Sequence, residues 1–379
     1  MLGLLRVAGG MLVGLAALLA GCAVEPPAEP GIGKPVAWSS LSGWQEDRLN
    51  EAWPALLAQC PRLARENLAW AGICAAASAV NATDANAIRA FIEQHFQPHE
   101  VLGSGGTRNG LITGYYQPIL KGSRNPSERF RYPLYARPND LLTVELSSLF
   151  PELQGKRVRG RLEGNKVVPY YPRAEIDGAA APLRGHELLW IDDPHGSFFL
   201  QIQGSGRVEL EDGTLVGVNY ADQNGHPYVA IGKKLIEMGA LGADEVSLFT
   251  IRAWLREHPE RAPELLAENP SYVFFTLREN VAENPRGSLN VPLTDERSIA
   301  VDRKVIALGS PVWLDTQLPL DQTPYRRLML AQDTGGAISG PVRADVYFGT
   351  GPRAEQLAGH MKARGQLYVL VPRAAAAGS

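Results

Sequence analysis

The stretch LMLAQDTGGAISGPVRADVYFGTG, residues 328–351, carries two aspartates in an apolar and glycine-rich setting. An apolar run ends at Asp333, glycines follow, and Asp345 opens a second short apolar run. This pattern predicts two strands joined by a turn, because glycine accepts backbone conformations that other residues avoid. Burial beside Val346, Tyr347 and Phe348 would raise the pKa of the Asp345 carboxyl, as a general acid near neutral pH requires. The alternative is that both acids only cap turns.

Short strands and turns dominate the rest of the chain, and helices flank them. Strand-like runs occur at 111–120, 167–171, 186–193, 196–210, 214–220 and 271–280. Helical periodicity occurs at 41–96, 228–241, 247–259, 259–269 and 352–365. The sequence therefore predicts a mainly β fold with flanking helices.

The composition narrows the class of partner. The chain has 379 residues and a formal net charge of -3, with no run of basic residues, which argues against nucleic-acid binding. The histidines and cysteines show no metal-ligand spacing, and no phosphate-binding loop lies between a strand and a helix. We expect no metal and no cofactor.

The N-terminus indicates export. An apolar stretch at 7–20 follows Arg6, is too short to span a bilayer, and fits the core of a signal peptide over 1–21. The sequence Leu19-Ala20-Gly21-Cys22 resembles a bacterial lipobox, which implies lipidation of Cys22. Ala23 in place of an aspartate favours the outer membrane, with the body facing the periplasm. The alternative is a plain signal peptide followed by an incidental cysteine.

The next residues are expected to form a spacer. The stretch 22–40 is rich in proline and glycine and lacks apolar periodicity, so it is interpreted as a tether between the lipid and the body. Beyond it lie the two remaining cysteines, Cys60 and Cys74, both in helical sequence. An oxidising compartment permits a disulfide between them, and two buried thiols are the alternative.

Asp333-Thr334-Gly335 also matches the short motif of aspartic proteases, which need two such carboxylates. A two-lobed protease would carry the motif twice. Asp315-Thr316 is followed by Gln317, so the second copy is missing and this reading is disfavoured.

The stretches 297–316 and 331–351 together resemble the 3D domain, which is named for three aspartates, here Asp302, Asp333 and Asp345. The chain also contains TGYYQP, FFLQIQGSGRVEL, NYADQNGHPYVAIGKKL and NPSYVFF in this order. With these motifs, residues 41–372 resemble the membrane-bound lytic murein transglycosylase A family.

The resemblance implies a fold of two domains. A double-psi β-barrel would be built from 41–122 and 272–379, and a smaller β domain at 123–271 would be inserted into it. A groove between the two domains would hold a glycan strand.

The resemblance also implies a reaction that uses one carboxyl group. Asp345 would protonate the leaving oxygen of the β-1,4 bond between MurNAc and GlcNAc, then accept the proton of the MurNAc C6 hydroxyl. The product would be a 1,6-anhydro end, formed without water. This activity is that of a peptidoglycan exotransglycosylase, a polysaccharide lyase, although the sequence does not distinguish cleavage at strand ends from internal cleavage.

Polar and aromatic residues are expected to bind the glycan. They are Thr113, Tyr116, Gln203, Ser205 and Asp333, with Gln201 and Gln203 on one side of a predicted strand. Asp333 is expected to position or support the site, and Asp302 to be structural. The alternative for the strand residues is core packing. His226, in an Asn-Gly-His turn, is interpreted as structural.

The main rival within this fold is a lipoprotein that binds peptidoglycan without cutting it. The expected partners are peptidoglycan strands, the outer membrane through the lipid anchor, and cell-wall synthesis or hydrolysis proteins.

Overall fold

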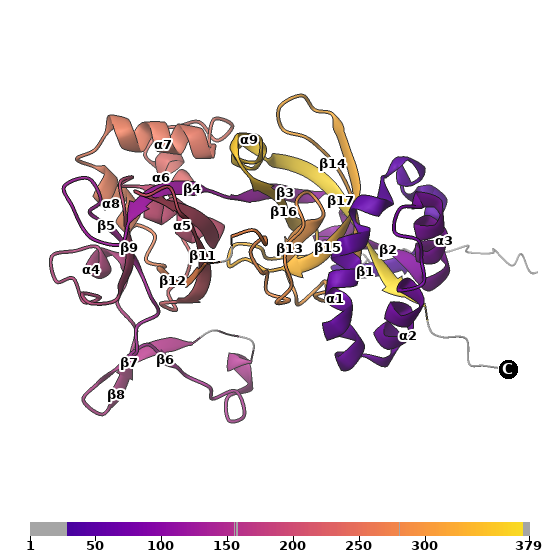
Figure 1. Ribbon diagram of the computed structural model, residues 1–379, viewed down its shortest axis with the longest axis horizontal. Coiled ribbons are helices and arrows are strands. Elements are labelled where there is room, and N and C mark those ends of the chain that lie inside the picture. The colour runs from indigo at the N-terminus through magenta and orange to yellow at the C-terminus, as the bar shows by residue number, and fades with distance from the viewer. Residues whose placement is uncertain (1–28, 155, 157, 280, 374–379) are drawn as a thin grey trace, which may run out of the picture.

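A computed structural model describes residues 29–154, 156, 158–279 and 281–373. The predicted signal peptide, Cys22 and the first residues of the predicted tether lie outside this part of the chain. None of the described helices is long and apolar enough to cross a membrane. The body is mainly β with flanking helices, which confirms the predicted fold class (Figure 1).

Six strands close into a barrel on one side of the molecule. Their order is β17-β14-β15-β13-β16-β3, and β3 pairs again with β17. The strands are β3 (Gly110–Gln117), β13 (Ser298–Val301), β14 (Pro311–Gln317), β15 (Pro324–Asp333), β16 (Arg343–Thr350) and β17 (Lys362–Pro372). Helix α9 (Pro352–His360) lies between the last two of them. A barrel, as the family resemblance implies, is therefore present.

The long strand β17 makes this closure possible. Its first half pairs with β3, from Lys362 opposite Thr113, and its second half pairs with β14 and β2. Alternate residues of the barrel strands, including Ile112, Val346 and Met329, form one buried hydrophobic cluster. The opposite faces of β3 and β16 carry a separate small cluster that includes Tyr115 and Tyr347.

Two further strands extend the barrel sheet at its N-terminal edge. Strand β1 (Gly31–Pro35) pairs with β2 (Phe96–Leu102), with Gly31 opposite Leu102. The prediction of a tether over the whole of 22–40 is therefore wrong from Gly31 onward. Residues 31–35 form a strand because they pair with β2, and the local Gly- and Pro-rich sequence does not indicate this partner.

A helical layer packs against the barrel on the side of β2 and β14 (Figure 1). It contains η1 (Trp38–Ser40), η2 (Trp44–Glu46), η3 (Leu49–Glu51), α1 (Trp53–Glu66), α2 (Leu68–Ala77) and α3 (Ala85–His95). Asp84 caps α3, because its side chain accepts the N–H groups of Asn86 and Ala87. The elements labelled η are short 3-10 helices, and one of them, η4 (Ser104–Gly106), leads into β3.

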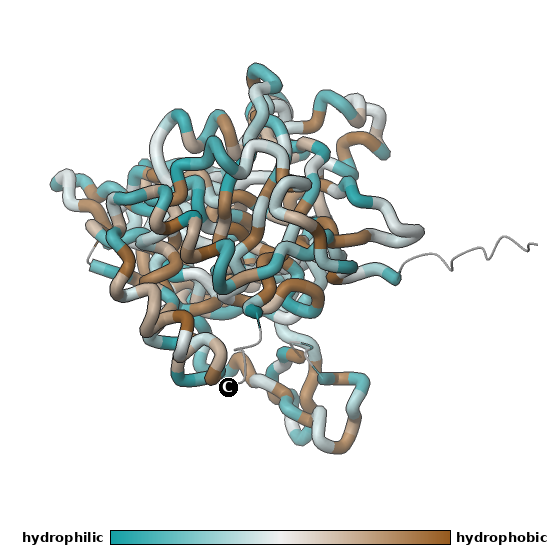
Figure 2. The backbone as a smooth tube through the Cα atoms, turned by 90° about the vertical axis from the view of Figure 1, so that its right-hand side faces the viewer, coloured by the Kyte–Doolittle hydropathy of each residue, from teal (hydrophilic) through white to brown (hydrophobic). Residues whose placement is uncertain are grey.

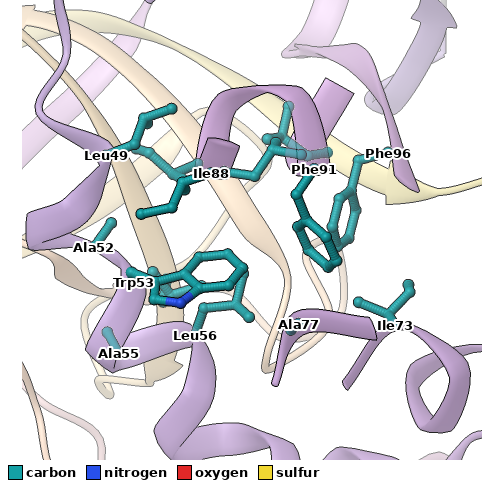
Figure 3. Packing of buried hydrophobic residues seen from close by; sticks show 14 of the residues in the cluster. Leu49, Ala52, Trp53, Ala55, Leu56, Ile73, Ala77, Ile88, Phe91 and Phe96 are labelled. Carbon is teal, nitrogen blue, oxygen red and sulfur yellow. The ribbon is translucent and has the colours of Figure 1, made fainter. Parts of the chain in front are cut away.

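Aromatic residues hold this layer to the barrel. Trp53 packs edge-on against Phe91 within the layer, and Trp44 packs edge-on against Trp313 of β14 (Figure 3 shows the Trp53 region). A disulfide between Cys60 and Cys74 joins α1 to α2, so the bridged alternative is the one present.

A second sheet forms the other half of the body (Figure 1), in the order β12-β11-β10-β4-β9-β5. Its strands are β4 (Ile119–Ser123), β5 (Tyr132–Tyr135), β9 (Glu187–Ile191), β10 (Ser205–Leu210), β11 (Leu215–Gln223) and β12 (Val273–Arg278). Its helices are α4 (Arg173–Ile176), α5 (Gly196–Gln203), α6 (Ile231–Glu237), α7 (Leu248–Glu257) and α8 (Ala262–Ala267). The chain passes from the barrel to this sheet at Pro118. Strands β4 and β12 both belong to the second sheet, whereas the predicted domain limits grouped their residues with the barrel.

The first half of the predicted strand 196–210 is instead the helix α5. Its apolar run buries Phe198, Phe199 and Leu200, and such a short run does not distinguish a buried strand from a buried helix. Gly204 ends the helix with a φ of 76°, a conformation that glycine accepts without a steric penalty. Only the residues from Ser205 onward form the strand β10.

A small third sheet projects from the second one (Figures 1 and 2). It contains β6 (Leu142–Thr143), β7 (Arg159–Glu163) and β8 (Lys166–Val168), with the turn η5 (Pro151–Leu153) nearby. Asp222 of β11 accepts hydrogen bonds from Arg137 and Arg159 and so ties this sheet to the larger one. His226 bonds to the Tyr170 carbonyl, which agrees with its predicted structural role.

A buried ion pair fixes the helical layer to the barrel. Arg297 donates to both carboxylate oxygens of Asp47, at 2.8 and 2.9 Å, and to Glu51 at 2.8 Å. Asp47 also accepts the backbone N–H of Leu328 in β15. The side chains of Arg297 and Asp47 are only 2% and 3% exposed, so each charge depends on the other for its solvation.

We expect Asp47→Ala to lower the free energy of unfolding by about 3–5 kcal/mol, because it leaves the Arg297 charge buried without its main partner. Urea denaturation checks this value. In the double variant Asp47→Leu/Arg297→Met no buried charge remains, so it should lose less stability than the single variant. A double variant that is less stable than Asp47→Ala would contradict this account.

Candidate active site

Strand register brings the two aspartates of the opening motif into one transverse row. Asp345 of β16 lies opposite Thr113 of β3 on one side and opposite Ala300 of β13 on the other. Ala300 in turn lies opposite Asp333 of β15. Because neighbouring strands are about 4.8 Å apart, the row Thr113–Asp345–Ala300–Asp333 places both acids on one face of the barrel.

The Asp345 carboxyl is half-buried and accepts one short hydrogen bond, from Thr113 Oγ1 to Oδ1 at 2.6 Å. Burial raises the pKa of Asp345 to about 6. The Thr113 hydrogen bond and the charge of Arg343 lower this pKa, whereas the nearby Asp333 raises it. Asp345 therefore has a pKa at which one carboxyl can both donate and accept a proton near neutral pH.

Arg343 is a site residue that the sequence reasoning missed. It lies two positions before Asp345 on β16 and donates to its neighbour's carbonyl, Ala344 O, at 2.6 Å. Burial lowers the pKa of Arg343, and the charge of Asp345 acts against this effect. The only signal in the sequence was the two-residue spacing from Arg343 to Asp345, which puts both side chains on the same face of a strand.

Asp333 is held by four donors. Tyr115 Oη donates to Oδ2 at 2.9 Å, while the N–H of Ser288, its hydroxyl and the N–H of Thr334 donate to Oδ1 at 2.8–2.9 Å. Burial raises the pKa of Asp333, and the hydrogen bonds oppose that effect. Since all four groups donate, they fit the ionised carboxylate, which can only accept. Tyr115 and Ser288 were not predicted.

Asp302 performs a different task at the end of β13. Its carboxylate accepts the N–H of Lys304 at 3.0 Å and the N–H of Gly340 at 2.9 Å. These bonds fasten the glycine-rich loop that connects Asp333 to Asp345. The contacts agree with a structural role for Asp302.

Tyr116 does not lie where the groove prediction placed it. It is 4% exposed, belongs to the barrel core cluster, and its hydroxyl donates to Glu355 of α9 at 2.8 Å. Successive side chains of a strand point to opposite faces, so Tyr115, not Tyr116, shares the face of Thr113. The groove assignment of Tyr116 is therefore corrected.

Gln203 and Ser205 lie where the second sheet meets the barrel. Gln203 is the last residue of α5, and its Oε1 accepts the N–H of Tyr116 at 3.0 Å. Gln201 was predicted to lie on the same side of a strand as Gln203, and this is wrong. Both residues belong to a helix, and Gln201 is buried and accepts a hydrogen bond from Arg173. Ser205 begins β10 and is 8% exposed. Glycan contacts by Thr113, Gln203, Ser205 and Asp333 remain predictions.

One cavity lies elsewhere, beside the buried ion pair of the helical layer. It has a volume of about 710 Å³, and its lining includes Asp47, Glu51, Arg297 and Arg327 but not Asp345. The groove between the two halves thus remains a prediction. Within the described ranges, no group of three or more His, Cys, Asp or Glu side chains could hold a metal ion.

The arrangement of the two acids also bears on the protease alternative. An aspartic protease needs two carboxyls that share one proton. Here both oxygens of Asp333 are occupied by donors from Tyr115, Ser288 and Thr334, whereas Asp345 bonds to Thr113. The two carboxyls therefore differ in environment and do not form such a dyad.

Comparisons with known proteins agree with this geometry. Residues 111–276 match the family model described as the MltA specific insert domain, and residues 297–371 match the 3D domain. The membrane-bound lytic murein transglycosylase A of Vibrio cholerae is 34% identical over 275 residues, which cover 70% of this chain and 67% of that protein.

Solved structures extend the similarity over nearly the whole body. The chain is similar to MltA from Neisseria gonorrhoeae, with 34% identity, a TM-score of 0.77, and coverage of 92% of this chain and 98% of that one. It is also similar to Escherichia coli MltA solved with bound chitohexaose, with 27% identity, a TM-score of 0.66, and coverage of 86% and 91%. The chain belongs to the membrane-bound lytic murein transglycosylase A family.

Proposed function

We propose that this protein is a lytic transglycosylase that cleaves the β-1,4 bond between MurNAc and GlcNAc in peptidoglycan and leaves 1,6-anhydroMurNAc ends. The observation that carries the proposal is the half-buried Asp345, whose pKa of about 6 lets it exchange a proton in both directions. The E. coli relative solved with bound chitohexaose supports an oligosaccharide as the ligand.

In the first step Asp345 acts as the general acid. Its proton passes to the glycosidic oxygen while the bond from that oxygen to C1 of MurNAc breaks, so GlcNAc leaves as an alcohol. Positive charge then develops at C1. The ionised Asp333, two strands away in the same row, favours this charge electrostatically without forming a bond to the sugar.

In the second step the same carboxylate acts as the general base. It accepts the proton of the MurNAc C6 hydroxyl while the C6 oxygen bonds to C1, which closes the 1,6-anhydro ring. Asp345 is again protonated, so the cycle balances without water. Hydrolysis would need a second carboxyl to activate water, and Asp333, held by four donors, is unsuited to that role.

We further propose that the protein is an outer-membrane lipoprotein that acts in cell-wall turnover. The relatives are named membrane-bound, and Cys22 follows an apolar export segment. Lipid chains on this cysteine would anchor the body to the membrane. The first described strand, β1, begins nine residues after Cys22, which leaves only a short spacer.

We expect Asp345→Asn to lower the release of anhydromuropeptides from sacculi by about 10²–10⁴-fold, because the amide cannot transfer the proton. Mass spectrometry of the products checks this loss and the chemistry together, since reducing ends would indicate a hydrolase. Asp321→Asn, which changes an exposed turn aspartate, is the matched control and should stay active. If Asp345→Asn keeps substantial activity, Asp345 is not the catalytic acid. Absence of products from the unsubstituted protein would favour a binding protein.

The rate of cleavage should fall as the pH rises through about 6, because the first step needs protonated Asp345. In Thr113→Val the hydrogen bond that favours the ionised carboxyl is lost, so the pKa of Asp345 rises and this fall moves to higher pH. A pH–rate profile of both proteins measures the change, which we expect to be about half a pH unit or more. A profile that is unchanged or moves to lower pH would argue against this role of Thr113.

Cys22→Ala should release the body from the membrane, since the predicted lipid attachment site is lost. Fractionation of cells that express each form checks this expectation, with total activity toward isolated sacculi as the control. Membrane retention of the Cys22→Ala form would show that another element anchors the protein.

A further inference from the structure

Arg207 has features of a binding group that the proposed mechanism does not use. It lies near the start of β10, where its backbone N–H donates to Pro118 O at 2.8 Å. This is the point at which the chain crosses from the barrel to the second sheet. Its Nε donates to Gln117 Oε1 at 2.9 Å, and Gln117 is fully buried.

The charge of Arg207 is held in place but not neutralised. In residues 29–154, 156, 158–279 and 281–373, its two terminal nitrogens form no hydrogen bond or ion pair. Asp295 lies close enough to interact with this charge, yet its carboxylate bonds to Asn284 instead. A guanidinium fixed at Nε by a neutral amide leaves two parallel N–H donors available, the arrangement that binds a carboxylate in a bidentate manner.

Two further donors face the same region without partners. Gln117 Nε2 and Tyr347 Oη are both buried, and neither has a hydrogen-bond partner among the described residues. Arg207 and Arg278 both act electrostatically on the Tyr347 hydroxyl. Buried polar groups usually have partners, so unpartnered donors beside a free guanidinium indicate an acceptor that the chain itself does not supply.

Strand geometry places the two unpartnered donors on the same face as the row of Thr113 and Asp345. Thr113, Tyr115 and Gln117 alternate along one face of β3, as Asp345 and Tyr347 do along β16. The four residue steps from Thr113 to Gln117 span about 13 Å along the strand. A saccharide with its scissile bond at Asp345 can therefore reach Arg207 along the same face.

From these observations we infer that Arg207, oriented by Gln117 and flanked by Tyr347, binds a carboxylate of the muramic acid unit of the substrate. This inference rests on the proposed function. Muramic acid differs from GlcNAc by a lactyl ether whose carboxyl group is free or joined to a stem peptide that carries its own carboxylates. Arg207 thus distinguishes murein from glycans without carboxylates.

The test compares three glycans in binding to proteins that carry Asp345→Asn, so that the strands stay intact. The glycans are chitohexaose, which has no carboxylate, murein strands stripped of peptides, and murein strands with stem peptides. Calorimetric titration gives a dissociation constant for each with Arg207→Gln, Arg207→Lys or neither. The matched control is Arg129→Gln, which changes an exposed arginine of the second sheet that pairs with Asp192.

We expect Arg207→Gln to weaken binding of carboxylate-bearing strands by about tenfold, the loss of one charged bidentate contact, and to change chitohexaose binding less than about twofold. Arg207→Lys should give an intermediate loss, because lysine keeps the charge but not the planar pair of donors. A loss with peptide-free strands identifies the lactyl carboxylate, and a loss with peptide-bearing strands alone identifies the stem peptide.

Equal weakening for all three glycans, or none for the murein strands, would overturn the inference. Thermal unfolding of each variant, with Arg207→Lys as the conservative change, separates a folding defect from a binding defect. A failure of the proposed function would show as missing anhydro products from the unsubstituted protein. That outcome is independent of the binding ratios measured with the Arg207 variants.

Discussion

The position of β16 between β3 and β13 is the constraint on which the site depends. This register places Asp345 between a hydroxyl donor, Thr113, and the small side chain of Ala300, with Asp333 one strand further. A shift of one residue would turn Asp345 into the barrel core and expose Ala344 or Val346 in its place. Because hydrophobic residues fill the inner face of β16, the packing that stabilises the barrel also fixes the acid on the outer face.

Two aspartates with the same intrinsic chemistry thus acquire different properties. Burial raises the pKa of both carboxyls, but Asp333 receives four hydrogen bonds that oppose this effect, whereas Asp345 receives one. The negative charge of Asp333 contributes to the raised pKa of Asp345. In the proposed mechanism Asp333 supplies a negative charge and Asp345 carries the proton, which is the division of roles that a single acid requires.

The barrel is also held from outside. The Arg297–Asp47 pair fastens the helical layer at β15, and Arg297 directly precedes β13, which carries Ala300. On the other side, Gln203 and Arg207 contact Tyr116 and Gln117 at the end of β3. The second sheet therefore supports β3, the strand that provides Thr113, whereas the helical layer supports β15 and the start of β13, the strands that carry Asp333 and Ala300.

The sequence by itself determined the mainly β class and the two strands that carry Asp333 and Asp345, and it supplied the prediction that Asp345 is the general acid. These features depend on local signals: apolar periodicity, glycine placement and a motif contiguous in the chain. Only the tertiary structure decided that Gly31–Pro35 is a strand, that residues 196–203 are helical, and that Tyr115 rather than Tyr116 faces the site. It also brought Ser288 to Asp333 and placed Arg207 against Gln117 at the end of β3. Strand pairing and burial depend on residues far away in the chain. A local sequence pattern therefore does not specify which strand pairs with it or how far its side chains are removed from water.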